Sequence, residues 1–293
     1  MLSKQNDSKH QALLVALRYY YDRAKMLHRY RVSGNILMAL LGLVMSMVPG
    51  VKPVSIYILP VIGFVWLLLS VILLQELEKK ITRRAATIQE EFDTSLFELP
   101  WRDRLVGRKA SPEQVAHASQ RFKGDRSKLL DWYTGLNAPS HFLNVLLAQR
   151  SSLAWDVKLR KRYAILVGVL SLVYLITTIT ICWRSDLKTY ILTMLIPSAS
   201  ILLHGITTCS EHWRRALSCE EVVQDLLELY RIKARNLERD ILHECREFQD
   251  FIFLKRCDIT LIPNKIYWLS RDNDDQVMKQ INAELSNISH DAV

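Results

Sequence analysis

The chain of 293 residues combines 49% hydrophobic residues with 24% charged residues and a net charge of +9. These proportions require apolar and charged residues to be segregated along the chain, which argues against an ordinary soluble domain. The positive charge would suit a nucleic-acid-binding protein, but in a membrane protein it more often reflects Lys and Arg beside the spans. The five cysteines show no metal-ligand or C-x-x-C spacing, so we expect reduced thiols, no metal and no cofactor.

The first segment, residues 1–31, is predicted to be an amphipathic helix in the cytoplasm. Its second half reads RYYYDRAKMLHRYR, in which aromatic and basic residues alternate. Such a mixture can bind a nucleotide through stacking and charge. Directly before a membrane span, however, Tyr and Arg more often form the interfacial belt, and we favour that interpretation.

Four apolar runs follow, in two close pairs. Residues 32–48 and 54–74 form the first pair, and residues 163–183 and 189–208 form the second. A membrane-spanning helix needs roughly 20 apolar residues, and buried helices of a soluble protein rarely occur in this arrangement. The turns PGVKP and RSDLK are short, so each pair must form an antiparallel hairpin. We therefore expect an all-α integral membrane protein with four transmembrane helices, in hairpins at 32–74 and 163–208, and a helical cytoplasmic domain.

The distribution of basic residues predicts the orientation of these hairpins. Fourteen Lys and Arg flank the spans on the side of the termini and the central region, whereas the tight turns hold only Lys52, Arg184 and Lys188. The positive-inside rule then places both termini and residues 75–162 in the cytoplasm. The basic charge is explained in this way, and no nucleic-acid polymer is expected as a partner.

The central region, 75–162, is predicted to be helical with a corner at FELPWRDRLVGRKASPEQV. Pro100 should end the helix that leaves the membrane, and Ser111 should cap the helix that begins at Pro112. Basic and aromatic residues at this corner are candidates for contact with an anionic signal: Trp101, Arg102, Arg104, Arg108 and Lys109. The alternative, which we favour, is a turn whose Trp packs on the helical bundle and whose arginines are solvated.

Residues 209–271 are predicted to form a long cytoplasmic helix and a cap. Apolar residues recur at steps of three and four, typical of the seam of a bundle or coiled coil. The seam comprises Val223, Leu227, Tyr230, Ala234, Leu237, Ile241, Cys245, Phe248 and Ile252. It needs a partner, either within the chain or in another subunit. The polar residues 272–293 are expected to be a flexible tail.

The fourth span carries polar residues along one face. They are Thr193, Pro197, Ser200, His204, Thr207, Thr208 and Glu211. A continuous polar face is costly against lipid, so it should face protein or water. It is either a helix–helix interface joined by hydroxyls or, when several subunits assemble, the lining of a pore.

The sequence holds no recognisable catalytic signature. It lacks a nucleophile elbow, a Gly-rich phosphate loop and a zinc-protease motif. His243, Glu244 and Cys245 are consecutive and point around a helix, so they are not expected to share a metal. We therefore expect a protein that is not an enzyme.

Five stretches resemble the S-4TM family of pore-forming membrane effectors. They are QNDSKHQALLVALRYYYDRAK, FDTSLFELPW, DWYTGL, AQRSSLAWDVKLRKRYA and FLKRCDITLIPNKIYWLSR. They occur in this order across nearly the whole chain. In the last stretch the family tends towards P-D-W, where this chain has Pro263, Asn264 and Lys265, which leaves the role of that stretch here less defined.

The resemblance implies an effector of bacterial antiphage systems of the CBASS type. Such a protein would reside in the inner membrane as a multi-pass homo-oligomer in contact with the lipid bilayer. A cytoplasmic signal of the cyclic-nucleotide type, or a protein partner, would open it, depolarise the membrane and cause abortive infection. Two other functions stay open: a membrane-anchored scaffold that conducts nothing, and an ion channel with a housekeeping role.

Overall fold

The computed structural model describes residues 2–47, 52–184, 186–236, 241–258 and 261–290, and within these ranges it contains helices and loops but no strand. The expected all-α class is thereby confirmed. The longer helices are α1 (Ser8–Met47), α2 (Lys52–Leu68), α3 (Gln75–Phe97), α5 (Pro112–Arg121), α6 (His141–Ile181), α8 (Ile196–Asn236), α9 (Leu242–Cys257) and α10 (Asn264–His290). The short ones are η1 (Leu2–Asn6), α4 (Asp103–Val106), η3 (Ser127–Leu129) and α7 (Leu187–Tyr190).

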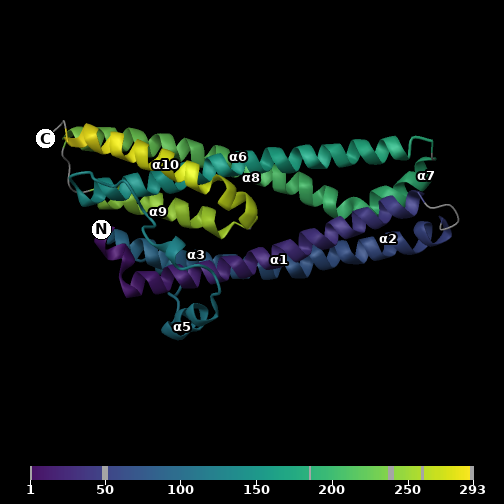
Figure 1. Ribbon diagram of the computed structural model, residues 1–293, viewed down its shortest axis with the longest axis horizontal. Coiled ribbons are helices and arrows are strands. Elements are labelled where there is room, and N and C mark those ends of the chain that lie inside the picture. Colours follow the sequence, from purple (N-terminus) through teal and green to yellow (C-terminus); the bar gives the residue numbers. More distant parts are fainter. Residues whose placement is uncertain (1, 48–51, 185, 237–240, 259–260, 291–293) are drawn as a thin grey trace.

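Two long helical hairpins make the molecule elongated (Figure 1). In one, α1 lies against α2 and α3, which are joined without interruption by a π-helical stretch, Leu69–Leu74. In the other, α6 lies against α8, which a second π-helical stretch, Ile191–Leu195, joins to α7. In the half of the molecule that contains α2 and α7, large apolar side chains such as Phe64, Leu170 and Ile206 are exposed. A surface of this kind is stable against lipid rather than water.

Three helical segments are long and apolar enough to cross a membrane: Tyr57–Phe97, His141–Ile181 and Leu187–Arg235. They cover all of the fourth predicted span and most of the second and third. The first predicted span, 32–48, forms the last part of α1, but within the described residues α1 does not reach the same length of apolar sequence. The run is the shortest of the four, and its last residue lies outside the described part of the chain.

The two hairpins touch where small residues allow close approach. A Cβ atom added to Gly63 on α2 would lie 3.0 Å from the Pro197 Cα of α8. Nearby, the Trp66 indole donates to Asn35 Oδ1 at 2.7 Å, and the Asn35 amide donates to the Ser200 carbonyl at 3.4 Å. The two hairpins are therefore in direct contact here, and a larger residue at position 63 would press against the backbone of α8.

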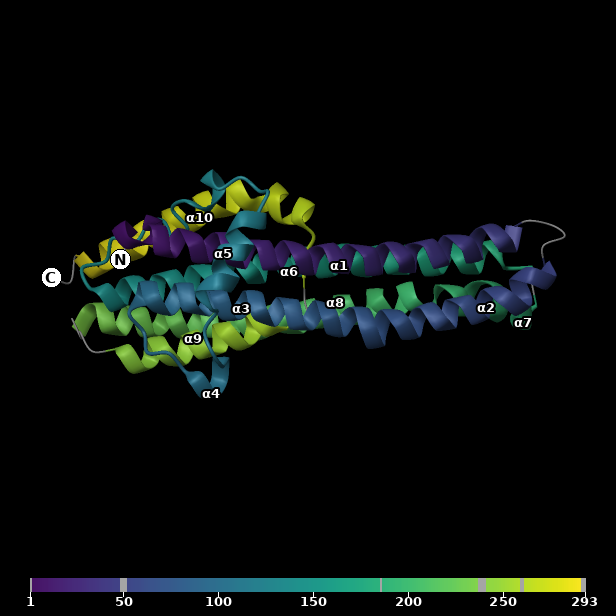
Figure 2. The same cartoon turned by 90° about the horizontal axis from the view of Figure 1, so that it is seen from below.

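At the opposite end of the molecule, α1, α3, α5, α6, α8, α9 and α10 form a bundle with one large apolar core. The expected corner at its side is confirmed. α3 ends at Phe97, Glu98 adopts a left-handed conformation with φ of 57°, and Pro100 follows. Ser111 caps α5 through a reciprocal capping box with Gln114. Between them, α4 projects from the bundle (Figure 2).

Two predictions for the C-terminal region need correction. The expected long helix of region 209–271 is divided: α8 ends at Asn236, and α9 begins at Leu242 and returns along the bundle. The division allows both halves of the apolar seam to enter the same core.

Residues 272–290, expected to be a flexible tail, instead belong to α10. The side chains of Asp274, Asn282 and Leu285 are buried there against α6 and α8. Asp274 is paired with Lys158 and Arg162, and the Leu285 carbonyl accepts a hydrogen bond from Tyr230. These partners order a segment whose composition alone is typical of a loose end.

Candidate functional site

A cavity of about 470 Å³ lies inside the bundle between α1, α3, α6, α9 and α10, and we call it the bundle cavity. The loop 131–136 contributes to its lining, and α8 contributes Arg215. Its volume falls within the range of pockets that bind small organic ligands. The side chains that line it then decide which chemistry fits.

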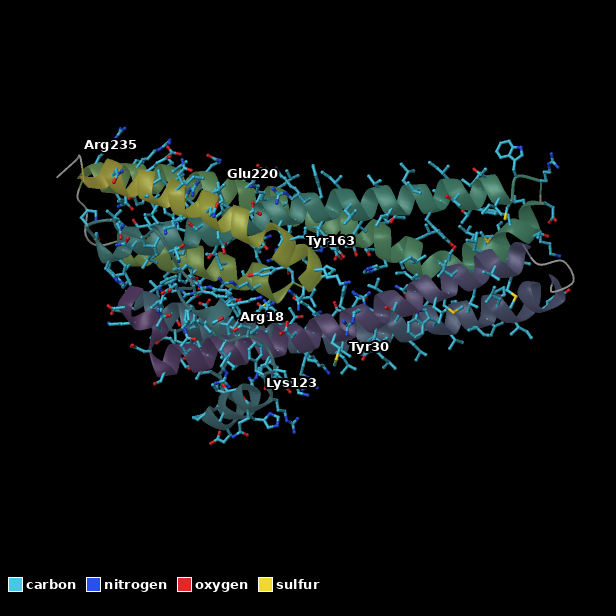
Figure 3. The ribbon with its side chains drawn as sticks, viewed as in Figure 1. Arg18, Tyr30, Lys123, Tyr163, Glu220 and Arg235 are labelled. Atoms are coloured by element: carbon cyan, nitrogen blue, oxygen red, sulfur yellow. The ribbon has the colours of Figure 1, made fainter. Side chains whose placement is uncertain are left out.

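One face of α1 supplies Arg18, Tyr21 and Lys25 to the cavity, at steps of three and four residues. The Arg18 guanidinium and the Lys25 ammonium lie 5.3 Å and 5.2 Å from the centre of the Tyr267 ring (Figure 3 labels Arg18). Lys25 also donates to Asn264 Oδ1 at 2.7 Å. Burial, assisted by the charge of Arg18, lowers the pKa of Lys25 to about 7. Its charge is therefore sensitive to any anion that enters.

Two buried polar groups of the cavity lining have no hydrogen-bond partner within the described part of the chain. They are the indole Nε1 of Trp155 and the hydroxyl of Thr82. The Trp155 ring meets the Tyr267 ring edge to face, with centres 4.8 Å apart. Buried polar groups normally have partners, so two orphans in one cavity point to a polar ligand or to water.

The cavity is rich in cations and aromatic rings. The basic side chains are Arg18, Lys25, Arg160, Arg215, Lys255, Arg256 and Lys279, and the acidic ones are Asp131, Asp156, Asp258 and Asp275. The aromatic side chains are Tyr21, Trp132, Tyr133, Trp155 and Tyr267. Stacking surfaces combined with a surplus of positive charge suit a ligand with planar rings and phosphate groups.

A buried ion cluster closes the cavity on the side of the membrane spans. The Asp156 carboxylate accepts from Arg160 Nε at 2.6 Å and from Arg215 Nε at 3.2 Å. Burial alone would raise the pKa of Asp156, but the two guanidinium groups outweigh it and hold the pKa well below its usual range. Arg160 Nη1 lies 3.0 Å from His212 Nδ1, and the His212 ring lies edge to face with Tyr163. The cluster thus joins α6 to α8 at the level of Tyr163 (Figure 3).

A second hollow, the lateral pocket, lies between the two hairpins beyond this cluster. Its volume is about 780 Å³, and it is lined by parts of α1, the α2–α3 helix, α8 and the end of α9. Arg215 lines both the lateral pocket and the bundle cavity. The ion cluster therefore stands between a site within the bundle and a hollow that reaches the apolar half of the molecule.

The structure places the predicted polar face of the fourth span on the π-helical stretch and α8, where it is only partly open. Thr193, Ser200 and Thr208 are buried, and Pro197 packs against α1 and α2. Thr207 and Glu211 are exposed. The members from Ser200 onward line the lateral pocket, namely Ser200, His204, Thr207, Thr208 and Glu211. In this conformation the part of the face around Thr193 and Pro197 is a helix–helix interface, and the part from Ser200 onward borders the lateral pocket.

The basic corner around α4 is separate from the bundle cavity, and none of its residues is among the cavity lining. Trp101 Nε1 donates to the Gly107 carbonyl at 3.0 Å, and the ring packs beside Val106 and Phe253. Lys109 lies over the Trp101 ring, and Arg102 lies 3.5 Å from Asp250. Arg104 and Arg108 are exposed. This arrangement favours the packed turn over a preformed signal site.

The predicted assembly seam is covered from within the chain. Six members are buried in the core, namely Val223, Tyr230, Ala234, Ile241, Cys245 and Ile252. Leu227 and Phe248 pack against that core, and Leu237 lies outside the described residues. For the described residues, the structure therefore supports a partner for the seam within the same chain rather than in another subunit.

Most of the bundle cavity could not be predicted from the sequence, because its lining comes from segments far apart in the chain. One signal was available. Four of the five stretches that resemble the S-4TM family supply lining residues, from QNDSKHQALLVALRYYYDRAK, DWYTGL, AQRSSLAWDVKLRKRYA and FLKRCDITLIPNKIYWLSR. In the first of these, the aromatic and basic residues of α1 are those for which nucleotide binding is the alternative to the interfacial belt.

Comparison with known proteins gives two matches of nearly full length. The family model described as "SMODS-associating 4TM effector domain" matches residues 1–285. A Bacillus cereus (strain VD146) protein described as a "probable CBASS effector molecule" is 35% identical over 297 residues, which cover 99% of each chain. No solved structure matches the chain significantly.

Proposed function

The chain belongs to the SMODS-associating 4TM effector family, and from that premise we propose that it is a homo-oligomeric, pore-forming effector of antiphage defence. It would reside in the bacterial inner membrane with four spans and both termini in the cytoplasm. Activation would depolarise the membrane and lead to abortive infection, without any catalytic step.

The polar face of α8 carries this proposal. A membrane span with hydroxyls, a histidine and a carboxylate along one side is costly unless that side meets protein or water. Here its inner half already borders the lateral pocket through Ser200 and His204. Four helices are too few to enclose a channel alone, so a conducting path requires several subunits with this face turned inward.

The bundle cavity is the best-supported place for the activating signal. A cyclic nucleotide offers planar bases to Trp155 and Tyr267 and phosphates to Arg18 and Lys25. The Trp155 indole is an unused donor of the kind that a base or phosphate oxygen satisfies. The corner at Trp101 stays a second candidate, but its exposed arginines offer no enclosed surface.

The ion cluster offers a route from the cavity to the membrane. A phosphate near Arg160 or Arg215 would compete with Asp156 for the guanidinium groups. Loss of that shared carboxylate would weaken the link between α6 and α8. The inner end of the polar face, at Glu211 directly before His212, would then be free to rotate towards a pore axis.

The pore is tested by replacing Ser200 and His204 with leucine and measuring leakage with a membrane-potential dye in cells where the system is triggered. We expect the double variant to abolish leakage while still being expressed and inserted. The matched control is Ile206→Leu, because Ile206 is exposed on another face of the same helix. Unchanged leakage in the double variant would exclude these residues from the pore.

The alternatives differ in their outcome. A scaffold that recruits a cytosolic partner predicts no leakage from the wild-type protein in liposomes, with or without a cyclic nucleotide. A housekeeping channel predicts leakage that is independent of the signal. A nucleotide-cyclase gene beside the gene for this chain would favour the defence role over the housekeeping role.

A further inference from the structure

The lateral pocket lies at the level where the predicted spans leave the membrane. Its lining includes His28 and Arg31 just before the first span and Lys79 just after the second. From α8 it includes Ser200 and, beyond the fourth span, Arg214. A hollow at this height between two hairpins is open to the headgroup layer of a bilayer rather than to its hydrocarbon centre.

Two buried polar atoms in the pocket have no partner within the described residues. The hydroxyl of Ser200 belongs to a side chain that is only 4% exposed, and His28 Nε2 belongs to one that is 6% exposed. The other ring nitrogen of His28 is engaged, 2.9 Å from Glu78 Oε1. The Ser200 hydroxyl is able to donate to an anionic oxygen, and so is His28 Nε2 in the tautomer that carries its proton there.

Positive charge dominates the lining of the pocket. Among its five basic side chains, Arg31 and Arg215 already have carboxylate partners outside the lining, and the lining itself adds only Glu211 and Asp258 as acids. Arg31 is held by the buried carboxylate of Glu78 at 3.1 Å, whereas the side chains of Lys79 and Arg214 are exposed. Basic residues beside a membrane span attract anionic lipid headgroups.

The rim of the pocket on the apolar side is hydrocarbon. Leu67 and Val71 come from the α2–α3 helix and Leu203 from α8, and both Val71 and Leu203 are more than 40% exposed. A free phosphate or a nucleotide gains nothing from this rim. A molecule with an anionic head and an acyl chain satisfies both ends of the pocket.

From these observations we propose that the lateral pocket binds an anionic phospholipid. Its phosphate lies between Lys79 and Arg214 and reaches the two orphan groups, and one acyl chain lies along Leu67, Val71 and Leu203. The lipid fills the inner end of the polar face of α8 in this conformation. The proposal needs only insertion of the chain in a membrane and does not depend on pore formation.

The test uses the full-length protein purified in detergent, with phosphatidylglycerol as the probe. We expect retention of the lipid in native mass spectrometry and a rise in the apparent unfolding temperature. Phosphatidylcholine and inorganic phosphate should do neither. The double variant Lys79→Gln with Arg214→Gln should weaken binding of phosphatidylglycerol about 25-fold, from about fivefold for each charge. The matched control is Lys80→Gln with Arg83→Gln, two exposed neighbours outside the pocket lining.

Three results would overturn the lipid site. They are equal stabilisation by phosphatidylcholine, equal stabilisation by inorganic phosphate, and an equal loss in the control pair, which would indicate general surface attraction. Ser200→Ala is an internal check, since it removes a single donor and should weaken binding about fivefold. A leakage assay on the same variants is independent, so a failed lipid site and a failed pore are distinguishable.

Discussion

Asp156 on α6 and Arg215 on α8 form an ion pair between a half-buried carboxylate and a buried guanidinium, with Arg215 Nη2 3.1 Å from Asp156 Oδ2. The same carboxylate oxygen accepts from Arg160, so one acid holds two cations. Arg215 also lines both the bundle cavity and the lateral pocket. This pair is therefore one structural connection between the cavity that we assign to the signal and the hollow beside the polar face.

We expect Asp156→Asn to destabilise the protein strongly. The substitution keeps the shape of the side chain but leaves two buried guanidinium groups without their counter-charge. Removing one partner of a buried ion pair typically costs about 3–5 kcal/mol. An apparent unfolding temperature measured in detergent should fall by at least about 6 °C.

The matched control for this prediction is Glu247→Gln, which removes a carboxylate that is 64% exposed on its side chain and lies 3.5 Å from His243. An exposed pair of this kind contributes less than about 1 kcal/mol. Equal effects of the two substitutions would contradict the structural role of Asp156.

Lys25 should make ligand binding depend on pH. Its pKa of about 7 means that the ammonium is partly discharged at neutral pH, and a bound phosphate stabilises the charged form. The affinity for a cyclic dinucleotide, measured by calorimetry, should therefore fall as the pH rises from 6 to 8. Lys25→Met should bind more weakly at pH 6 and lose this dependence, whereas Lys80→Met should keep it.

The same shift has a consequence without ligand. The folded-state pKa of Lys25 is below its unfolded value of about 10.4, so the unfolded chain binds more protons between these two values. The contribution of Lys25 to stability should therefore rise as the pH increases from about 7 to about 10. A contribution that falls over this range, obtained by comparison with Lys25→Met, would contradict the burial of the ammonium.

Several features could be predicted from sequence because they depend on local chemistry. The apolar runs and short turns predict the hairpins, and Pro100 and Ser111 mark helix boundaries through backbone restriction and capping. The order of α10 could not be predicted in this way. It depends on buried polar residues such as Asp274, whose partners lie more than 100 residues away on α6. The bundle cavity escaped prediction for the same reason.

α10 should be an integral part of the fold, and Leu285→Ala tests this. Leu285 is 6% exposed and lies in the main core, and its carbonyl accepts from Tyr230 at 3.0 Å. Truncating a buried leucine costs about 2–5 kcal/mol through lost contacts and a cavity. Thermal unfolding should show this loss, and Glu284→Ala on the exposed face should be nearly neutral. Equal stability of the two variants would support the original prediction that this segment is a flexible tail.

The corner at Trp101 should matter for packing rather than for the signal. Trp101→Ala removes a ring that packs beside Val106 and Phe253. We expect the free energy of unfolding to fall by about 2 kcal/mol. Truncating a fully buried aromatic residue costs more, about 3 kcal/mol or above. Arg104→Ala with Arg108→Ala should change neither stability nor the affinity for a cyclic dinucleotide. A clear loss of affinity in that pair would move the signal site to this corner.

Gly63 should hold the two hairpins in the closed arrangement. A Cβ atom at this position would lie 3.0 Å from the Pro197 Cα and 3.5 Å from the Ile196 carbonyl oxygen, both backbone atoms of the helix that carries the polar face. Backbone cannot move aside as a flexible side chain does, so Gly63→Val must push α2 away from α8. We expect ion leakage without any signal, measured as depolarisation with a membrane-potential dye. Val61→Leu, on the exposed side of α2, is the matched control and should leak no more than the wild type. A folded Gly63→Val protein that stays silent until triggered would show that this contact does not keep the pore shut.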